Sequence, residues 1–295
     1  MESLLKQVLE SIQSTGLEDL SPEDVGRLLA VGSSETLDET LTLGDGDLES
    51  LEEECQEHKH EMTEDIKKEL ERNNSGYPHD PLYLHLAHKL RNWMDSRSPD
   101  ALTLPDFEFL NEGESVTERK QLFAALTPDV CEFKDLWNED QLERKKQMLL
   151  TILKKLKKRG ILALLGMRRT VGTLEMFPPT RSCLQNSFNQ RHKLTCQLSV
   201  GARALSKHCH RDQTASWWAT STGSEAAKNA HANVILNRIL DEAVWINIHS
   251  LPHDVVALEV RCLGGYGARW TADGAKFRGF LEPQMKDGHS VGWRH

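Results

Sequence analysis

The last third of the chain alternates apolar and polar residues, which is typical of strands with one buried face. Five segments have this pattern: 193–204, 243–249, 255–262, 266–270 and 275–282. Residues 225–242 instead repeat apolar positions at helical spacing, and Ser224 is the predicted N-cap of this helix. Asp273-Gly274 marks a hairpin turn between the last two strands. We therefore predict an α+β fold in which one helix covers a largely antiparallel sheet.

The earlier part of the chain predicts helices. Residues 2–13 and 82–95 have apolar stripes at helical spacing. The strongest helical pattern runs over 139–158, where lysines and arginines surround an apolar stripe, and Gly160 is the predicted end. Residues 47–72 are mostly charged, which is typical of a solvated helix or a disordered segment. The predicted α+β class therefore includes a helical, partly disordered, acidic N-terminal region.

The charges are distributed unevenly along the chain. The whole chain has 36 basic and 45 acidic residues, a net charge of −9. Residues 1–80 hold 22 acidic and six basic residues, whereas residues 141–211 hold 16 basic and two acidic ones. We predict three regions: an acidic helical and partly disordered region over 1–80, a basic and mostly helical region over 81–190, and an α+β domain over 191–295.

The basic helix at 139–158 has two interpretations. A basic amphipathic helix of this kind can bind a protein partner. Alternatively, its apolar stripe packs in the core and its lysines are solvated. The sequence leaves both interpretations open.

Composition and motifs exclude several classes of protein. The longest apolar run, at 161–165, is far shorter than the roughly 20 residues of a membrane-spanning helix, so we expect no membrane partner. The N-terminus lacks the pattern of a secretory signal, and six cysteines without a CxxC pair indicate reduced thiols. P-loop, dinucleotide-binding and HExxH motifs are absent. These features predict a cytoplasmic or nuclear protein.

One face of the predicted sheet collects charged and aromatic residues. If consecutive strands pair as neighbours, seven residues share the uncovered face: Trp245, His249, Glu259, Arg261, Arg269, Arg278 and Phe280. Arg261, Arg269 and Arg278 are candidates for binding phosphate, because a guanidinium donates two parallel hydrogen bonds to an oxyanion. Glu259 is a further candidate for ligand binding beside them. Alternatively, these side chains are solvated and Glu259 only pairs with an arginine.

Seven of the 13 histidines follow residue 205. His208, His210 and His249 are candidates for proton transfer, because imidazole titrates near neutral pH. In an extended segment, His208 and His210 would project to one side, and a turn would bring His253 close to His249. These four histidines are therefore also candidates for a divalent metal, although nothing else in the sequence indicates a metal or cofactor.

The pair Trp217-Trp218 lies in a polar stretch, which favours at least one exposed ring that can stack on a base. Alternatively, both rings fill the core of the domain, and the sequence leaves this open. Together with the arginines and histidines, an exposed ring predicts an intracellular protein whose C-terminal domain binds a phosphate-bearing ligand, either RNA or a nucleotide. Two alternatives remain: a protein-interaction adaptor without ligand chemistry, and a histidine-dependent metal hydrolase. The sequence does not decide whether a reaction is catalysed.

Overall fold

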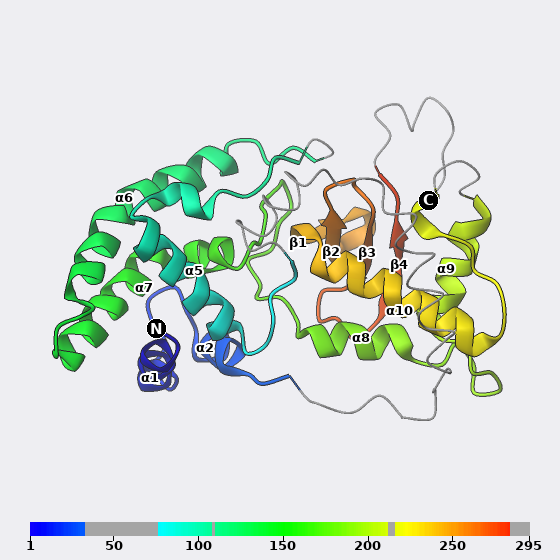
Figure 1. Ribbon diagram of the computed structural model, residues 1–295, viewed down its shortest axis with the longest axis horizontal. Coiled ribbons are helices and arrows are strands. Elements are labelled where there is room, and N and C mark those ends of the chain that lie inside the picture. Colours follow the sequence, from blue (N-terminus) through cyan, green and yellow to red (C-terminus); the bar gives the residue numbers. More distant parts are fainter. Residues whose placement is uncertain (33–75, 108–109, 212–215, 284–295) are drawn as a thin grey trace.

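The computed structural model describes residues 1–32, 76–107, 110–211 and 216–283, and Figure 1 shows a group of helices on the left beside a small sheet with further helices on the right. The predicted α+β class is confirmed, because helices in the earlier part of the chain are followed by a four-stranded antiparallel sheet near its C-terminal end. The prediction for residues 47–72 lies outside the described residues.

The described α-helices all precede the sheet in the sequence. They are α1 (Glu2–Ile12), α2 (Pro22–Leu29), α5 (Leu82–Ser96), α6 (Ser115–Leu136), α7 (Leu142–Leu164), α8 (Arg181–Asn189), α9 (Val200–Arg211) and α10 (Glu225–Asp241). Short 3-10 turns occur at η1 (Pro99–Leu102), η2 (Ser216–Trp218) and η3 (Pro252–Asp254). Within the described ranges, none of these helices is long and apolar enough to span a bilayer.

Consecutive strands of the sheet pair as antiparallel neighbours, as the turn signals predict. The strands are β1 (Ala243–Leu251), β2 (Val255–Cys262), β3 (Gly267–Thr271) and β4 (Phe277–Leu281), in that spatial order. Helix α10 lies across one face of the sheet, and α8 and α9 pack beside it against β4 (Figure 1). The hydroxyl of Ser224 accepts a hydrogen bond from the backbone N–H of Ala227, so the predicted N-cap of α10 is confirmed.

The prediction of a strand over 193–204 is wrong, because α9 begins at Val200. Ser199 accepts a hydrogen bond from the N–H of Ala202 at 3.0 Å, which is the geometry of a helix start. A Cβ atom at Gly201 would lie 2.2 Å from the ring of Phe188, so glycine allows α9 to approach α8 closely. Small residues at alternate positions fit this close helical packing as well as they fit a strand.

The basic helix ends close to its predicted boundary, although Gly160 is not the residue that ends it. Helix α7 consists of two helical segments that meet at a kink at Lys157 (φ 56°, ψ 179°), and the second segment reaches Leu164. A Cβ atom at Gly160 would lie 2.9 Å from a methyl carbon of Leu156 and 3.1 Å from one of Leu122. Gly160 therefore serves packing between α7 and α6, and the apolar residues after it bury the second segment of α7 in the core.

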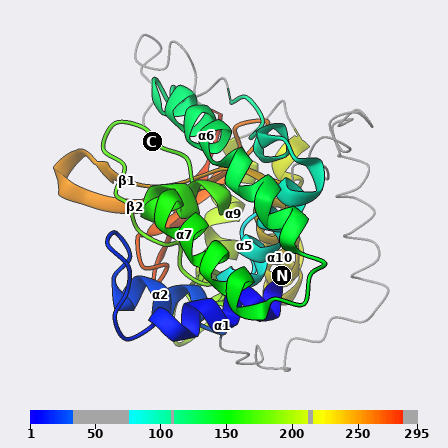
Figure 2. The ribbon, with the colours of Figure 1, turned by 90° about the vertical axis from the view of Figure 1, so that its left-hand side faces the viewer.

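Helices α1 and α2 pack at one end of the helical part, beside α5 and α7 (Figure 2). Two lysines of α7 form ion pairs with this N-terminal part: Lys158 with Asp24 at 2.8 Å and Lys157 with Asp19 at 3.5 Å. Part of the positive charge of α7 is therefore neutralised within the molecule. The protein-partner interpretation of the same helix stays a prediction.

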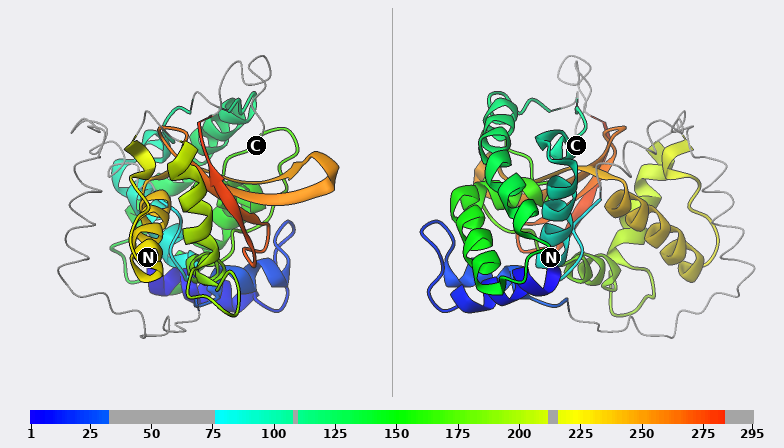
Figure 3. Two further views of the ribbon diagram at one scale, coloured as in Figure 1. Left: turned by 90° about the vertical axis from the view of Figure 1, so that its right-hand side faces the viewer. Right: turned by 60° about the vertical axis from the view of Figure 1, so that its left-hand side comes forward.

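The segment 167–176 joins the helical part to the sheet. It runs along the outer edge of β1, where the N–H groups of Arg168 and Leu174 donate to the carbonyls of Ile246 and Ile248 at 2.7 and 2.8 Å. The side chain of Arg168 is buried and donates to the carbonyls of Val244 and Pro105. Beyond this segment, the β1–β2 hairpin projects away from the helices (orange in Figure 3).

Candidate functional site

The candidate site is the face of the sheet opposite α10, which we call the polar face. Its residues come from three strands: Trp245, Asn247 and His249 of β1, Glu259 and Arg261 of β2, and Arg269 of β3. Asn247 lies opposite Glu259, and Glu259 lies opposite Arg269. The intervening residues of these strands are buried in the core. The strand alternation thus predicts correctly that these residues share one face.

Glu259 is the centre of this group. Nε2 of His249 lies 2.6 Å from Oε2 of Glu259, and Nη2 of Arg261 lies 2.7 Å from Oε1. Nε of Arg261 donates to the same Oε1 at 3.1 Å, and Nη2 of Arg269 lies 3.4 Å from Oε2. The Glu259 side chain is only 3% exposed. One buried carboxylate therefore holds an imidazole and two guanidinium groups.

The carboxylate of Glu259 is ionised at neutral pH. Burial alone would raise its pKa, but the hydrogen bond from His249 and the charges of Arg261 and Arg269 outweigh burial and lower the pKa from 4.5 to about 2. An ionised carboxylate only accepts hydrogen bonds, so the proton between the two groups lies on Nε2 of His249. In the neutral imidazole, Nδ1 then has a free lone pair.

The two arginines differ in their access to solvent. Arg261 is 3% exposed, and its Nη1 donates to the carbonyls of Gly265 and Glu282 at 2.6 and 3.0 Å. It therefore fixes the β2–β3 turn and the end of β4. The Arg269 side chain is 26% exposed, and its buried Nε has no hydrogen-bond partner within the described part of the chain. Of these two candidates, Arg269 is the one that can reach a ligand.

The structure does not bring Arg278 and Phe280 into this group. A register shift between Arg269 and Trp270 of β3 turns both Phe277 and Phe280 toward the helices, so the expectation that Phe280 lies on the polar face is wrong. Arg278 is exposed, and no ion pair joins it to Glu259. A role of Arg278 in phosphate binding stays a prediction.

Two threonines that the sequence patterns do not single out complete the polar face. Thr173 donates from Oγ1 to Oδ1 of Asn247, and Nδ2 of Asn247 donates to Oγ1 of Thr170, both at 3.0 Å. The backbone of Thr173 is bridged to His249. Both threonines belong to the segment 167–176, whose place beside β1 depends on long-range pairing. The two hydroxyl groups therefore lie next to Asn247 on the polar face without any periodic signal in the sequence.

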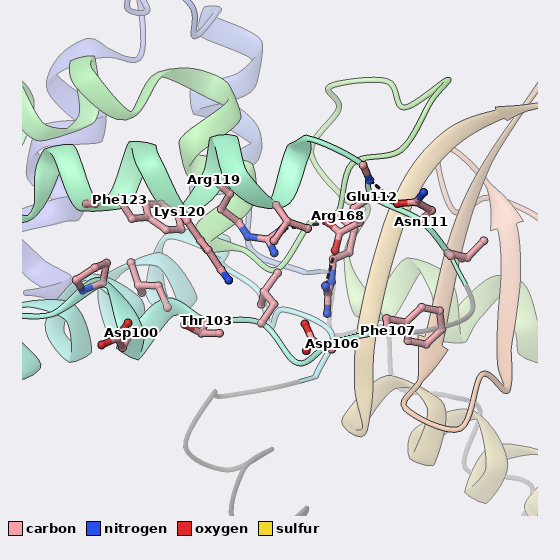
Figure 4. Close-up of a pocket in the computed structure, with 17 residues that line it drawn as sticks. Asp100, Thr103, Asp106, Phe107, Asn111, Glu112, Arg119, Lys120, Phe123 and Arg168 are labelled. Carbon is pink, nitrogen blue, oxygen red and sulfur yellow. Dashed lines mark hydrogen bonds and ion pairs between the residues drawn. The ribbon is translucent and has the colours of Figure 1, made fainter.

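The opposite end of the polar face is closed by aromatic packing. The ring of Phe107 stacks on Trp245 with centroids 5.2 Å apart. Beyond Phe107, a cavity of about 760 Å³ lies between α6 and the segment 99–107 (Figure 4). Arg119 and Lys120 of α6 point into it, and the pair formed by Glu112 and Arg168 lies at its sheet end (Figure 4).

The histidines do not form one group. His208 belongs to α9, and its Nδ1 lies 3.0 Å from Oε1 of Glu282. The expectation of an extended His208–His210 pair is wrong, because residues 200–211 are helical. His253 lies in η3, at the turn of the β1–β2 hairpin. Among the described residues, no group of three or more His, Cys, Asp or Glu side chains could hold a metal ion.

The expectation that Trp217 or Trp218 stays exposed is also wrong. Both rings are buried, at 8% and 1% exposure. Trp217 stacks on Tyr266 with centroids 4.5 Å apart, and the guanidinium of Arg238 lies 4.7 Å from its ring centroid. The polar residues around this pair in the sequence suggest exposure, but packing against other aromatic rings buries both tryptophans. Little ring surface remains for stacking on a base.

The comparisons with known proteins concern the same part of the chain. Residues 188–282, about a third of the sequence, are similar to the family described as the CdiA C-terminal tRNase toxin domain. This region contains α9, α10 and the whole sheet, and therefore Glu259 and its three partners on the polar face. No curated protein and no solved structure matches the chain.

Proposed function

We propose that the C-terminal part of this protein binds RNA and cleaves it, with tRNA as the substrate class and His249 as the proton-transfer residue. The observation that supports this most directly is the coincidence of two findings. The region similar to a tRNase family holds a histidine that is bonded to a buried, ionised carboxylate beside an accessible arginine.

His249 is suited to taking a proton from a substrate hydroxyl. Glu259 orients the ring and stabilises the charged imidazolium that proton transfer produces, because it accepts a hydrogen bond from the Nε2–H group of His249 and stays ionised. This leaves Nδ1 of His249 for the substrate. Glu259 is a positioning residue in this scheme, since its low pKa makes it a poor acceptor of a substrate proton.

The chemistry that these groups favour is attack by the 2′-hydroxyl of the RNA on the neighbouring phosphorus. Nδ1 of His249 takes the hydroxyl proton, the bond between O2′ and phosphorus forms, and the bond between phosphorus and O5′ breaks. The leaving O5′ takes a proton from water. Arg269 stabilises the negative charge that develops on the phosphate oxygens. The products are a 2′,3′-cyclic phosphate and a 5′-hydroxyl.

The test is cleavage of bulk tRNA by the full chain, with the product ends identified chemically. The variant His249→Ala should lose at least roughly a hundredfold in rate, the lower end of what general base catalysis contributes. Arg269→Ala should reduce the cleavage rate by a similar factor, because it removes the positive charge that stabilises the reacting phosphate. The matched control is His88→Ala, which removes an exposed histidine of α5 whose ring is hydrogen-bonded to Asn92, far along the chain from the polar face.

Three outcomes would overturn this proposal. One is tRNA cleavage by His249→Ala at the rate of the unaltered chain. Another is tRNA binding without any cleavage. The third is cleavage that requires an added divalent metal and leaves a 5′-phosphate, which would instead support the metal hydrolase alternative.

A further inference from the structure

A second, smaller cavity lies between α6 and α7 and has three arginines in its wall. Its volume is about 220 Å³, and Arg119 of α6, Arg159 of α7 and Arg169 of the segment 167–176 line it together with Glu118. Arg119 also lines the larger cavity of Figure 4. Three positive groups from three parts of the chain therefore meet one carboxylate in this small space.

The partners of two arginines are already defined. Arg119 pairs with Glu112 at 3.1 Å, but Glu112 also pairs with Arg168 at 2.6 Å and is therefore shared. Arg169 pairs with Glu118 at 3.0 Å, and both of these side chains are about half exposed. An exposed pair of this kind is weak and is easily exchanged for a stronger anion.

Arg159 has no carboxylate within ion-pair distance among the residues that the structure describes. Its Nη2 donates to the carbonyl of Met167 at 2.7 Å, and the side chain is half-buried. Burial lowers its pKa, the charges of Arg169 and Arg119 lower it further, and Glu175 and Glu112 act in the opposite direction. A positive group in a desolvated place next to like charges gains most from a bound anion.

We propose that Arg119, Arg159 and Arg169 form a binding site for a phosphate group, separate from the polar face. Guanidinium groups bind phosphate oxygens in pairs, and three of them surround this cavity. The volume of about 220 Å³ lies below the roughly 300 Å³ at which small-molecule pockets begin, so the cavity suits the phosphate group and not a whole nucleotide.

The position of this site makes an RNA backbone one source of the phosphate. Arg169 is followed directly by Thr170, whose hydroxyl accepts from Asn247 on the polar face. Thr173, which is bridged to His249, lies four residues after Arg169, so their Cα atoms are at most roughly 14 Å apart. An RNA strand on the polar face could therefore place a second phosphate here. This source rests on the proposed function, whereas binding of free phosphate does not.

The first experiment measures thermal stability of the full chain in inorganic phosphate against sodium chloride of equal ionic strength. Phosphate should raise the melting temperature with a saturable dependence on its concentration, because a ligand of the folded state stabilises it by mass action. Arg169→Gln should weaken phosphate binding roughly tenfold. Glu118→Gln should strengthen it, because this variant removes the competing carboxylate.

The opposite changes in phosphate affinity of Arg169→Gln and Glu118→Gln distinguish loss of binding from a folding defect, because a folding defect would weaken phosphate binding in both variants. The matched control is Arg144→Gln, which removes an exposed arginine of α7 that donates only to Gln141 in the described structure. It should bind phosphate as the unaltered chain does. Equal stability in phosphate and chloride, or phosphate binding unchanged in both Arg169→Gln and Glu118→Gln, would overturn the site.

The second experiment tests the RNA source with tRNA binding in the background of His249→Ala, so that the RNA stays intact. Adding Arg169→Gln should reduce the slope of log affinity against log salt by about 0.7 to 0.9, the loss of one phosphate contact. An unchanged slope, with phosphate binding still weakened, would overturn the RNA source and leave a site for free phosphate. Absence of tRNA binding would refute the proposed function alone.

Discussion

Substitution of Glu259 by glutamine keeps the size of the side chain and removes its negative charge. In the folded protein, Arg261 would then be a buried cation without a charged partner among the described residues, and Arg269 and His249 would lose the same counter-ion. Loss of one partner from a buried ion pair costs about 3–5 kcal/mol. Because the amide oxygen of glutamine can still accept from Arg261, we expect the lower end, about 3 kcal/mol.

The assay is urea unfolding of the full chain at pH 7, followed by tryptophan fluorescence. A loss of about 3 kcal/mol would be a large part of the 5–15 kcal/mol that is usual for folded proteins. The control is Glu242→Gln, whose side chain pairs with Arg238 at 3.3 Å but is 24% exposed. This partly solvated pair should contribute less than about 1 kcal/mol.

The dependence of the unfolding free energy on pH independently checks that the charge of Glu259 stabilises the fold. The pKa of Glu259 is lowered from 4.5 to about 2 by folding, so its stabilising contribution is fully present above pH 4.5 and is lost as the pH falls toward 2. The difference in stability between the unaltered chain and Glu259→Gln should therefore narrow below pH 4.5. A difference below about 1 kcal/mol at pH 7, or one that stays constant down to pH 3, would refute this reasoning.

Two further substitutions test the fold itself. Gly201→Ala should destabilise the protein by about 1–3 kcal/mol in thermal unfolding, because the new methyl group would lie 2.2 Å from the buried ring of Phe188. The control Gly26→Ala, in α2 with no atom within 4 Å of the added carbon, should be neutral or stabilising, and destabilisation of both to the same extent would contradict the packing argument. Ser224→Ala should cost about 1 kcal/mol by removing the N-cap of α10, and Ser224→Asp should restore it. An equal loss in both Ser224 variants would show that the cap hydrogen bond contributes nothing.

The strands and α10 could be predicted from the sequence because each has a clear period and a turn residue beside it. The turn signals indicate antiparallel neighbours, and the alternation along each strand places His249, Glu259, Arg261 and Arg269 on one face, whereas the register that brings them together comes from the structure. The segment 193–204 was predicted wrongly, because small residues at alternate positions suit a close helix contact as well as a strand.

The rest of the candidate site depends on features that leave no periodic trace. The register shift in β3 and β4 reverses the face of Phe280, and such an irregularity is not visible in the alternation of residues. Thr170 and Thr173 reach the polar face only because their segment pairs with β1, more than seventy residues further along the chain. Pairing over that distance is set by the tertiary structure.

The pairing of the segment 167–176 with β1 has a consequence for any shortened form of this protein. A chain limited to residues 188–282 would lose the hydrogen bonds that Arg168 and Leu174 make to Ile246 and Ile248. The outer side of β1 would then present a row of unsatisfied carbonyl and amide groups, flanked by apolar side chains, to any other strand in solution. Such an edge is a template for self-association. The helical part of the chain thus protects the sheet from its own copies, and residues 188–282 are best studied with that protection in place.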